Sequence, residues 1–447
     1  MKRPDLDEMV RAIPDFAALL TVDEMNESSR HLAAQHPSIA RLWEVGRSRR
    51  GEPLEALVIG SGPRVAVLVG LPHPNEPIGA MTCEYLAGRL CDDRSLGYRQ
   101  DFTWVILKVA DPDGSRLNEG WFRPPFTVNQ YLRYFYRPPS HEQVEWTFPV
   151  TYKRFRSGPQ LPETLALMRI IDELRPAVLF SLHNAAFGGV YWYLSHPLPQ
   201  LYGELHAAAA GQGLPLARGE PELPYAVEFS TAVYRMPGLA DIYDYLEQNG
   251  QEPLTARSGG TCSADYARSR YGTRTLVSEV PFFSHPKSDD TRPMGIGRQA
   301  AFLASAGWLE RFHAEVGELF EQVAPRIPPN PFRSAVESFL VHAPRLAGAQ
   351  RRWAESSVEP AAQATVAQDF DLRVISRIYR LRILAMLIRA LPVDEPERGR
   401  AEVMLERHLQ DLDSEMGHCR PFPIRKQVAV QVASVLSLVR YLQAAPQ

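Results

Sequence analysis

The chain has 447 residues, of which 45% are hydrophobic and 23% are charged, and 49 Lys and Arg residues stand against 52 Asp and Glu residues, a formal net charge of -3. This composition is typical of a folded globular protein and excludes a mainly disordered one. The near-balance of charge provides no general attraction for nucleic acid or for an anionic membrane.

The cysteines and the first residues of the chain indicate the cellular compartment in which the protein is expected. The cysteines Cys83, Cys91, Cys262 and Cys419 have no C-x-x-C spacing, so neither a thiolate zinc site nor a disulfide framework is expected. Residues 5–8 are acidic where a secretory signal would need an apolar core, and no later segment is long and apolar enough to span a membrane. We therefore expect a cytoplasmic protein.

Strand and helix patterns alternate along the first two thirds of the chain. A helical lead-in is predicted over about residues 20–45. Short apolar, β-rich runs predict strands, whereas helix-like spacing of apolar residues predicts helices between them. This alternation predicts an α/β fold with a mixed, largely parallel sheet flanked by helices. The predicted strands are residues 64–70, 103–107, 177–182 and 275–278, and the predicted helices are residues 78–90 and 163–174.

Two further regions interrupt or follow this pattern. Residues 121–157 are rich in Arg, Tyr, Phe and Pro and predict an ordered loop excursion near the site. The proline-rich residues 326–331 predict the boundary between a catalytic domain, 1–326, and an α-helical C-terminal extension, 327–447. Apolar stripes in the extension are compatible with packing on the catalytic domain, with partner recognition, or with homo-oligomerisation through these helices. The stripes are Phe370, Val374, Ile378, Leu381, Ala385 and Ile388, and Val428, Val432, Val435, Val439 and Leu442.

Metal-binding side chains occur where two predicted strands end. His73 and Glu76, spaced H-x-x-E, follow the strand 64–70, and His183 ends the strand 177–182. If these strands are parallel, the three side chains emerge at the same sheet edge. Two imidazoles and one carboxylate leave a fourth position open on zinc, which is the pattern of a catalytic rather than a structural site.

Glu279 lies inside the otherwise apolar strand Val277-Ser278-Glu279-Val280. A carboxylate in such a setting is costly to bury unless it is paired or lies near a cation, so a functional role is favoured. Its expected role is that of a general base.

These motifs and their order along the chain resemble those of the carboxypeptidase A-like zinc carboxypeptidases. The resemblance covers about residues 45–285 and implies a zinc carboxypeptidase-like fold. The matching segments are His73-Pro74-Asn75-Glu76, Asp111-Pro112-Asp113-Gly114, Leu182-His183, Ser258-Gly259-Gly260-Thr261 and Glu279.

The resemblance also implies a reaction, the metal-assisted hydrolysis of an amide. One Zn²⁺ per chain would be held by His73, Glu76 and His183, and Glu279 would act as the catalytic base. The stretch Arg116-Leu117-Asn118-Glu119-Gly120 is similar to an R-x-N-x-x-G stretch of bacterial members. It therefore makes Arg116 the candidate partner of the oxyanion and places Arg116 and Asn118 among the substrate-binding residues.

The sequence lacks the residue pair with which the family binds the carboxylate of its substrate. Glu145 and Trp146 stand where an Asn-Arg pair binds the substrate carboxylate, and Thr255 stands where a tyrosine is expected. An acid and an indole cannot replace a planar guanidinium. Three readings remain open: another loop arginine binds the carboxylate, the substrate has no free carboxylate, or Glu145 binds a cationic group. The candidate arginines are Arg123, Arg137, Arg154 and Arg156.

The leading hypothesis is therefore a zinc-dependent metallocarboxypeptidase that releases a terminal residue from a peptide or peptide-like small molecule. The closest alternative is a zinc-dependent amidase or deacylase on the same scaffold, which would need no carboxylate clamp. A non-catalytic interaction protein is the third hypothesis, and the presence of Glu279 argues against it.

Overall fold

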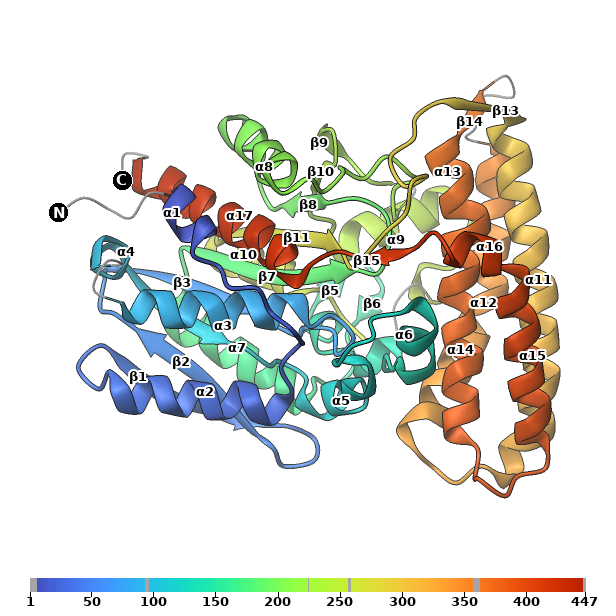
Figure 1. Cartoon of the computed structure of the whole chain (residues 1–447), viewed down its shortest axis with the longest axis horizontal. Helices are drawn as coiled ribbons and strands as arrows, with labels where there is room; N and C mark the ends of the chain where they lie inside the picture. Colours follow the sequence, from blue (N-terminus) through green and yellow to red (C-terminus); the bar gives the residue numbers. More distant parts are fainter. Residues whose placement is uncertain (1–5, 93–95, 224, 256–258, 357–361, 445–447) are drawn as a thin grey trace.

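A nine-stranded sheet forms the centre of the protein, with strand order β1-β2-β4-β3-β7-β11-β8-β10-β9 (Figure 1). The computed structural model describes residues 6–92, 96–223, 225–255, 259–356 and 362–444. The strands of the sheet are β1 (Ala40–Arg47), β2 (Pro53–Ile59), β3 (Arg64–Val69), β4 (Phe102–Leu107), β7 (Val178–Ala185), β8 (Tyr191–Leu194), β9 (Glu228–Ser230), β10 (Val233–Arg235) and β11 (Arg274–Pro281).

The central strands β4, β3, β7 and β11 run parallel to one another. Antiparallel pairs are formed by β1 with β2, by β2 with β4, by β8 with β11 and by β9 with β10. Strand β10 pairs parallel with β8. The predicted fold class, a mixed sheet flanked by helices with a helical C-terminal region, is confirmed. Because parallel strands end at the same edge, the residues that follow β3, β7 and β11 lie close together.

Helices cover both faces of the sheet, as the buried and nearly continuous apolar strands require. Alternate residues of β3 point to opposite faces, so Leu68 joins one core cluster and Val67 the other. The first face is covered by α1 (Leu6–Arg11), α2 (Val22–Gln35), α3 (Ile78–Cys91), α8 (Pro199–Gln212) and α17 (Ile424–Ala444). The second is covered by α7 (Pro162–Leu174) and α10 (Ser263–Tyr271).

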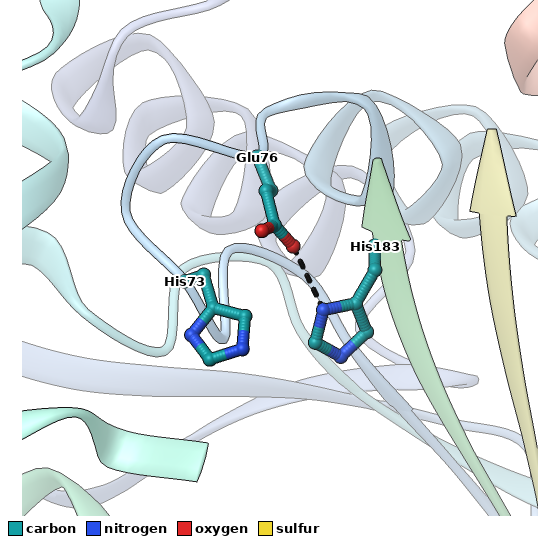
Figure 2. A group of neighbouring side chains, drawn as sticks. All are labelled: His73, Glu76 and His183. Carbon is teal, nitrogen blue, oxygen red and sulfur yellow. Dashed lines mark hydrogen bonds and ion pairs between the residues drawn. The ribbon is translucent and has the colours of Figure 1, made fainter. Parts of the chain in front are cut away.

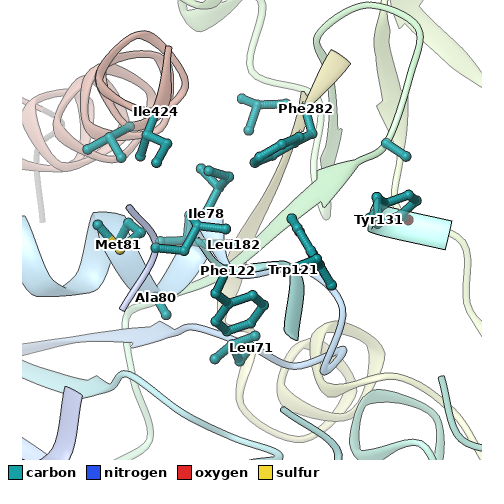
Figure 3. Packing of buried hydrophobic residues seen from close by; sticks show 14 of the residues in the cluster. Leu71, Ile78, Ala80, Met81, Trp121, Phe122, Tyr131, Leu182, Phe282 and Ile424 are labelled. Atoms are coloured by element: carbon teal, nitrogen blue, oxygen red, sulfur yellow. The ribbon is translucent and has the colours of Figure 1, made fainter. Parts of the chain in front are cut away.

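The core between α3, α17 and β7 is packed closely. Figure 3 shows Ile424 of α17 above Ile78 and Met81 of α3, with Leu182 of β7 beside them. A Cβ at Gly79 would lie 2.1 Å from the Leu182 carbonyl oxygen, so this approach of α3 to β7 requires glycine. The start of α3 is thereby held next to the end of β7.

The helical region stands at one end of the sheet as a bundle of long helices (Figure 1). It begins with α11, before the predicted boundary at residue 326, and its last helix, α17, returns to the sheet and belongs to the main core. Both predicted apolar stripes are buried. The helices of the region are α11 (Arg298–Val323), α12 (Pro331–Ser356), α13 (Val366–Phe370), a π-helical turn (Asp371–Ile375), α14 (Ser376–Ala390), α15 (Glu397–Asp411) and α16 (Asp413–Met416).

The predicted helical lead-in over residues 20–45 is wrong in its second half. Helix α2 ends at Gln35, and Leu42 lies in the edge strand β1. Pro37 explains the end of the helix, because proline disfavours the helical conformation of the residue before it and lacks the N–H that a helix uses.

The loop excursion 121–157 is ordered and packs against the sheet edge and the helical region. It contains α6 (Val128–Tyr134) and a hairpin of β5 (Thr151–Tyr152) and β6 (Phe155–Arg156). None of the described helices is long and apolar enough to cross a lipid bilayer. The other elements are α4 (Leu96–Asp101), α5 (Pro112–Arg116), α9 (Leu239–Gln248), β12 (Phe283–Ser284), β13 (Pro293–Gly297), β14 (Gln363–Thr365) and β15 (Arg420–Pro421).

Candidate metal centre

The structure brings His73, Glu76 and His183 together at the carboxyl edge of the sheet (Figure 2). All three side chains are buried, and one potential ligand atom from each lies within 4.8 Å of the others. The His73 and His183 ring centroids are 5.0 Å apart, and His183 Nδ1 donates to Glu76 Oε2 at 2.7 Å. In the described part of the chain, no other group of three His, Cys, Asp or Glu side chains meets this condition.

Local structure explains this convergence. After β3 the chain turns at Leu71, which has a φ of 49°, and passes through the His73–Glu76 turn into α3. Asn184, the residue after His183, accepts a hydrogen bond from the Ile78 N–H at 3.1 Å and so ties the start of α3 to β7. Glu279 of β11 is paired in register with His183 of β7.

Neighbouring groups orient the candidate ligands. Ser181 Oγ lies 2.8 Å from His183 Nε2, which leaves Nδ1 facing Glu76. Arg137 Nη1 donates to Glu76 Oε1 at 2.8 Å, while the other carboxylate oxygen, Oε2, accepts from His183. Such contacts behind the ligands fix ligand orientation and tune metal affinity.

Burial and mutual contact set the charges of the group. Burial alone would raise the pKa of Glu76, but His73, His183 and Arg137 more than offset it, and the net pKa falls below its usual range. Burial opposes protonation of His183, yet the hydrogen bond and charge of Glu76 raise its pKa to about 9. Burial raises the pKa of Glu279 well above its usual range. Glu279 Oε1 lies 3.8 Å from His183 Nδ1.

The residues present suit zinc. Two imidazoles and one carboxylate from three separate positions are a common donor set of catalytic zinc sites, and they leave room for water or substrate. A bound cation would also compensate the negative charge of the carboxylates that are buried near the imidazoles. His73, Glu76 and His183 would hold the ion.

A pocket of about 190 Å³ opens onto this group. Its lining comes from the strand ends, from the loop excursion and from the helical region. Its lining residues include His73, Glu76, Tyr131, Arg137, Glu145, Trp146, His183, Tyr193, Glu222, Glu279, Tyr379 and Arg382.

Glu145 lines this pocket and is only 1% exposed. Its Oε1 accepts from the Ser263 hydroxyl at 2.8 Å and from the Ser263 N–H at 3.3 Å, whereas Oε2 is buried without a hydrogen-bond partner. Burial raises the pKa of Glu145. Trp146 stacks on His73, with ring centroids 6.0 Å apart.

The two glycines of the Ser-Gly-Gly-Thr motif pack against the backbone of residues 146–148 in the loop excursion. The Gly260 N–H donates to the Trp146 carbonyl at 2.6 Å, and a Cβ at Gly260 would lie 2.0 Å from the Phe148 carbonyl oxygen. The backbone of 146–148 can approach this closely only if glycine is present. Ser258, the first residue of the motif, lies outside the described residues.

The structure does not bring Arg116 and Asn118 to the pocket. Arg116 Nη2 pairs with Asp23 Oδ1 of α2 at 2.6 Å, and Arg116 Nε pairs with Glu52 Oε1 at 2.6 Å. Asn118 is fully buried and accepts from the Tyr136 N–H at 2.9 Å, so it holds the loop excursion in place. Both residues lie close to the Asp-Pro-Asp-Gly segment in the sequence, but the fold does not place them in the pocket at the metal group.

Of the four loop arginines considered as a carboxylate clamp, only Arg137 lines the pocket. Arg123 pairs with Glu24 at 2.6 Å, and Arg154 pairs with Glu252 at 3.1 Å. Arg156 Nη1 donates to the Lys153 and Phe155 carbonyls at 2.7 and 2.8 Å.

Sequence reasoning missed three site residues. Tyr193 was not among the predicted site residues, but it lines the pocket and donates to Glu222 at 3.0 Å. Arg382 lies on α14 next to Leu381 of a predicted apolar stripe, but it is not a residue of that stripe and was not predicted as a site residue. Gln431 of α17 donates to the His183 carbonyl. The alternating aromatics of 191–193 gave a signal for Tyr193, whereas the contacts of Arg382 and Gln431 depend on how distant helices pack.

The family model for zinc carboxypeptidases matches residues 25–257, just over half of the chain. The chain belongs to this family. No match was found among curated proteins.

Solved structures with a similar arrangement include carboxypeptidase A from Helicoverpa armigera, with 17% identity and a TM-score of 0.38 over 59% of this chain and 64% of that chain. A metallo-carboxypeptidase from Burkholderia cenocepacia has 18% identity and a TM-score of 0.35 over 59% and 60%. One from Pseudomonas aeruginosa, in complex with (2-guanidinoethylmercapto)succinic acid, has 15% identity and a TM-score of 0.34 over 57% and 59%. The matched part of this chain therefore spans less than two thirds of each of these chains.

Proposed function

We propose that the protein is a zinc-dependent hydrolase that cleaves an amide bond and releases a terminal residue from a peptide or peptide-like small molecule. The observation that carries this proposal is the buried His73, Glu76 and His183 group with Glu279 Oε1 3.8 Å from His183 Nδ1. Membership of the zinc carboxypeptidase family supports it.

The chain's own residues have separable roles in this proposal. Zinc, when bound, would polarise the substrate carbonyl and make a water molecule more acidic. Glu279 projects into the pocket beside the ligand group, where it can take a proton from water and return it to the leaving nitrogen. Arg137, which donates to Glu76 at 2.8 Å, is a positioning residue.

Glu145 is proposed to bind the substrate. Its Oε2 is buried in the pocket lining without a hydrogen-bond partner, and such an oxygen is stabilised by an N–H donor or a cationic group of a ligand. The second candidate function, an amidase or deacylase, rests on the same residue, because an acid stands where the family binds a free carboxylate.

A substrate panel tests the proposal. The zinc-loaded protein would be incubated with peptides that have a free or an amidated C-terminus and with N-acyl amines that lack a carboxylate, and release of primary amine would be measured. We expect release from free-carboxylate substrates. Preference for amidated or N-acyl substrates would favour the amidase or deacylase, and no release from any substrate by the zinc-loaded protein would contradict amide hydrolysis.

A further inference from the structure

We propose that Arg382, on helix α14 of the helical region, is the residue that recognises an anionic group of the substrate. Arg382 lines the same pocket as the candidate metal ligands although it lies almost 200 residues after His183 in the sequence. This inference rests on the proposed function and assigns it a specificity-determining residue that replaces the Asn-Arg pair of the family.

The two arginines that line the pocket differ in the partners of their side chains. Arg137 is already committed, since its Nη1 donates to Glu76 Oε1 at 2.8 Å and its Nε donates to Gln143 Oε1 at 3.2 Å. Arg382 makes no ion pair with an Asp or Glu of the described residues, and its Nε is buried without a hydrogen-bond partner. Of the two, only Arg382 has its charge available for a ligand.

Aromatic side chains surround the Arg382 guanidinium. Its central carbon lies over three aromatic rings, 3.9 Å from the centroid of Tyr379, 4.5 Å from Phe135 and 5.0 Å from Tyr131. Ring faces stabilise the positive charge and restrict the side chain. Tyr131 also hydrogen-bonds to Arg382, but none of these three aromatic residues supplies the negative charge of a carboxylate. A planar guanidinium donates hydrogen bonds in its own plane, so a preorganised arginine of this kind suits a carboxylate.

The three aromatic rings around Arg382 come from two different regions of the chain. Tyr131 and Phe135 belong to the loop excursion, whereas Tyr379 and Arg382 lie one helical turn apart on α14. Helix α6 and helix α14 are in contact. The arginine therefore sits where the catalytic region and the helical region meet, and both regions are needed to complete the pocket.

Ligand binding tests this inference without turnover. The probes are N-acetyl amino acids with varied side chains, each paired with its carboxamide. Their affinities would be measured by calorimetry on zinc-loaded protein in which Glu279→Gln removes turnover, and in this background the wild-type residue at position 382 is compared with its variants. We expect the wild type to bind the best carboxylate at least about 10-fold more tightly than its amide. Arg382→Gln should reduce this preference to less than about 2-fold. Arg382→Lys, which keeps the charge but not the planar donors, should retain part of it.

Arg377→Gln is the matched control, because Arg377 lies on the same helix, stacks on Trp308 at 5.1 Å and does not line the pocket. It should keep the full preference. The inference is overturned if the wild type shows no carboxylate preference, which includes binding neither probe, or if both Arg382 variants keep the wild-type preference. If Arg382→Gln does not fold, the result for Arg382→Lys decides. Failure of the proposed function would appear separately, as absence of amine release from every substrate.

Discussion

The side-chain amide of Gln431 donates a hydrogen bond to the backbone carbonyl of the metal-site residue His183, with a donor to acceptor distance of 2.7 Å. The same amide lies 3.2 Å from the Ser278 carbonyl, and Gln431 Oε1 accepts from the Thr82 hydroxyl at 2.7 Å. One fully buried residue of the last helix therefore joins β7, β11 and α3 behind the candidate metal centre.

Gln431→Leu should weaken both stability and zinc binding. It leaves the Thr82 hydroxyl without its acceptor and the His183 carbonyl without this donor, a loss of about 1–3 kcal/mol. Loosened support of a ligand should weaken zinc binding about 10-fold. Urea unfolding and zinc titration against a chelator measure the two effects. Gln427→Leu, on the same helix but bonded to the Phe422 carbonyl, is the control, and equal zinc affinity in both variants would argue against a link to the metal site.

Arg137→Met should weaken zinc binding about 10–100-fold while leaving the fold intact, because Glu76 loses the partner that orients its carboxylate. Zinc affinity would be measured with a chromophoric chelator. The control is Arg154→Met in the same loop, because Arg154 forms an exposed pair with Glu252 and does not line the pocket. A variant of Arg137 with the affinity of this control would show that the ion pair does not position Glu76.

Glu279→Gln should retain zinc but lose turnover by at least about 100-fold, because the amide keeps the shape of the side chain and cannot accept a proton from water. Zinc content and the rate of amine release, measured on the same preparation, separate the two properties. Turnover near the wild-type rate would remove Glu279 from the proposed mechanism.

Asp371→Asn should stabilise the protein at neutral and higher pH. Burial raises the pKa of Asp371 to about 7, above its value of 3.8 in the unfolded chain. The folded state therefore binds the proton more tightly, and stability falls as pH rises from about 4 to 7. Asparagine lacks this titration and can still accept from the Glu220 N–H.

The expected gain at pH 8 is about 1–4 kcal/mol, and it should vanish near pH 4. Urea unfolding of both proteins across this range measures it. Burial also raises the pKa of Asp111 to about 7, but Asp111 is present in both proteins, so the difference between them isolates Asp371. A variant less stable than the wild type at pH 8 would contradict the account.

The three candidate metal ligands could be predicted from the sequence because each lies at or just after the end of a predicted strand. His73, Glu76 and His183 each follow an apolar run closely, and the parallel order of β3 and β7 brings those ends together. Arg116 shows the limit of that reasoning. It also lies near a motif, but Asp23 of α2 and Glu52 bind it elsewhere, and no local pattern specifies those long-range partners.

Arg382 and Gln431 could not be predicted for a related reason. Both lie in helices whose apolar spacing predicts burial but not the surface that each helix covers. Whether a polar residue in such a stripe meets solvent, another helix or a pocket depends on how α14 and α17 pack against parts of the chain more than 200 residues away.

The most direct test of the central claim is the zinc content of the purified wild-type protein and of His73→Ala, measured by elemental analysis after reconstitution and dialysis. His73 lies in a turn outside the strands and helices, so its replacement should leave the fold intact, which circular dichroism would verify. The account predicts about one zinc ion per wild-type chain and loss of that ion in the variant. No zinc in the wild type, or full retention of zinc by folded His73→Ala, would contradict it.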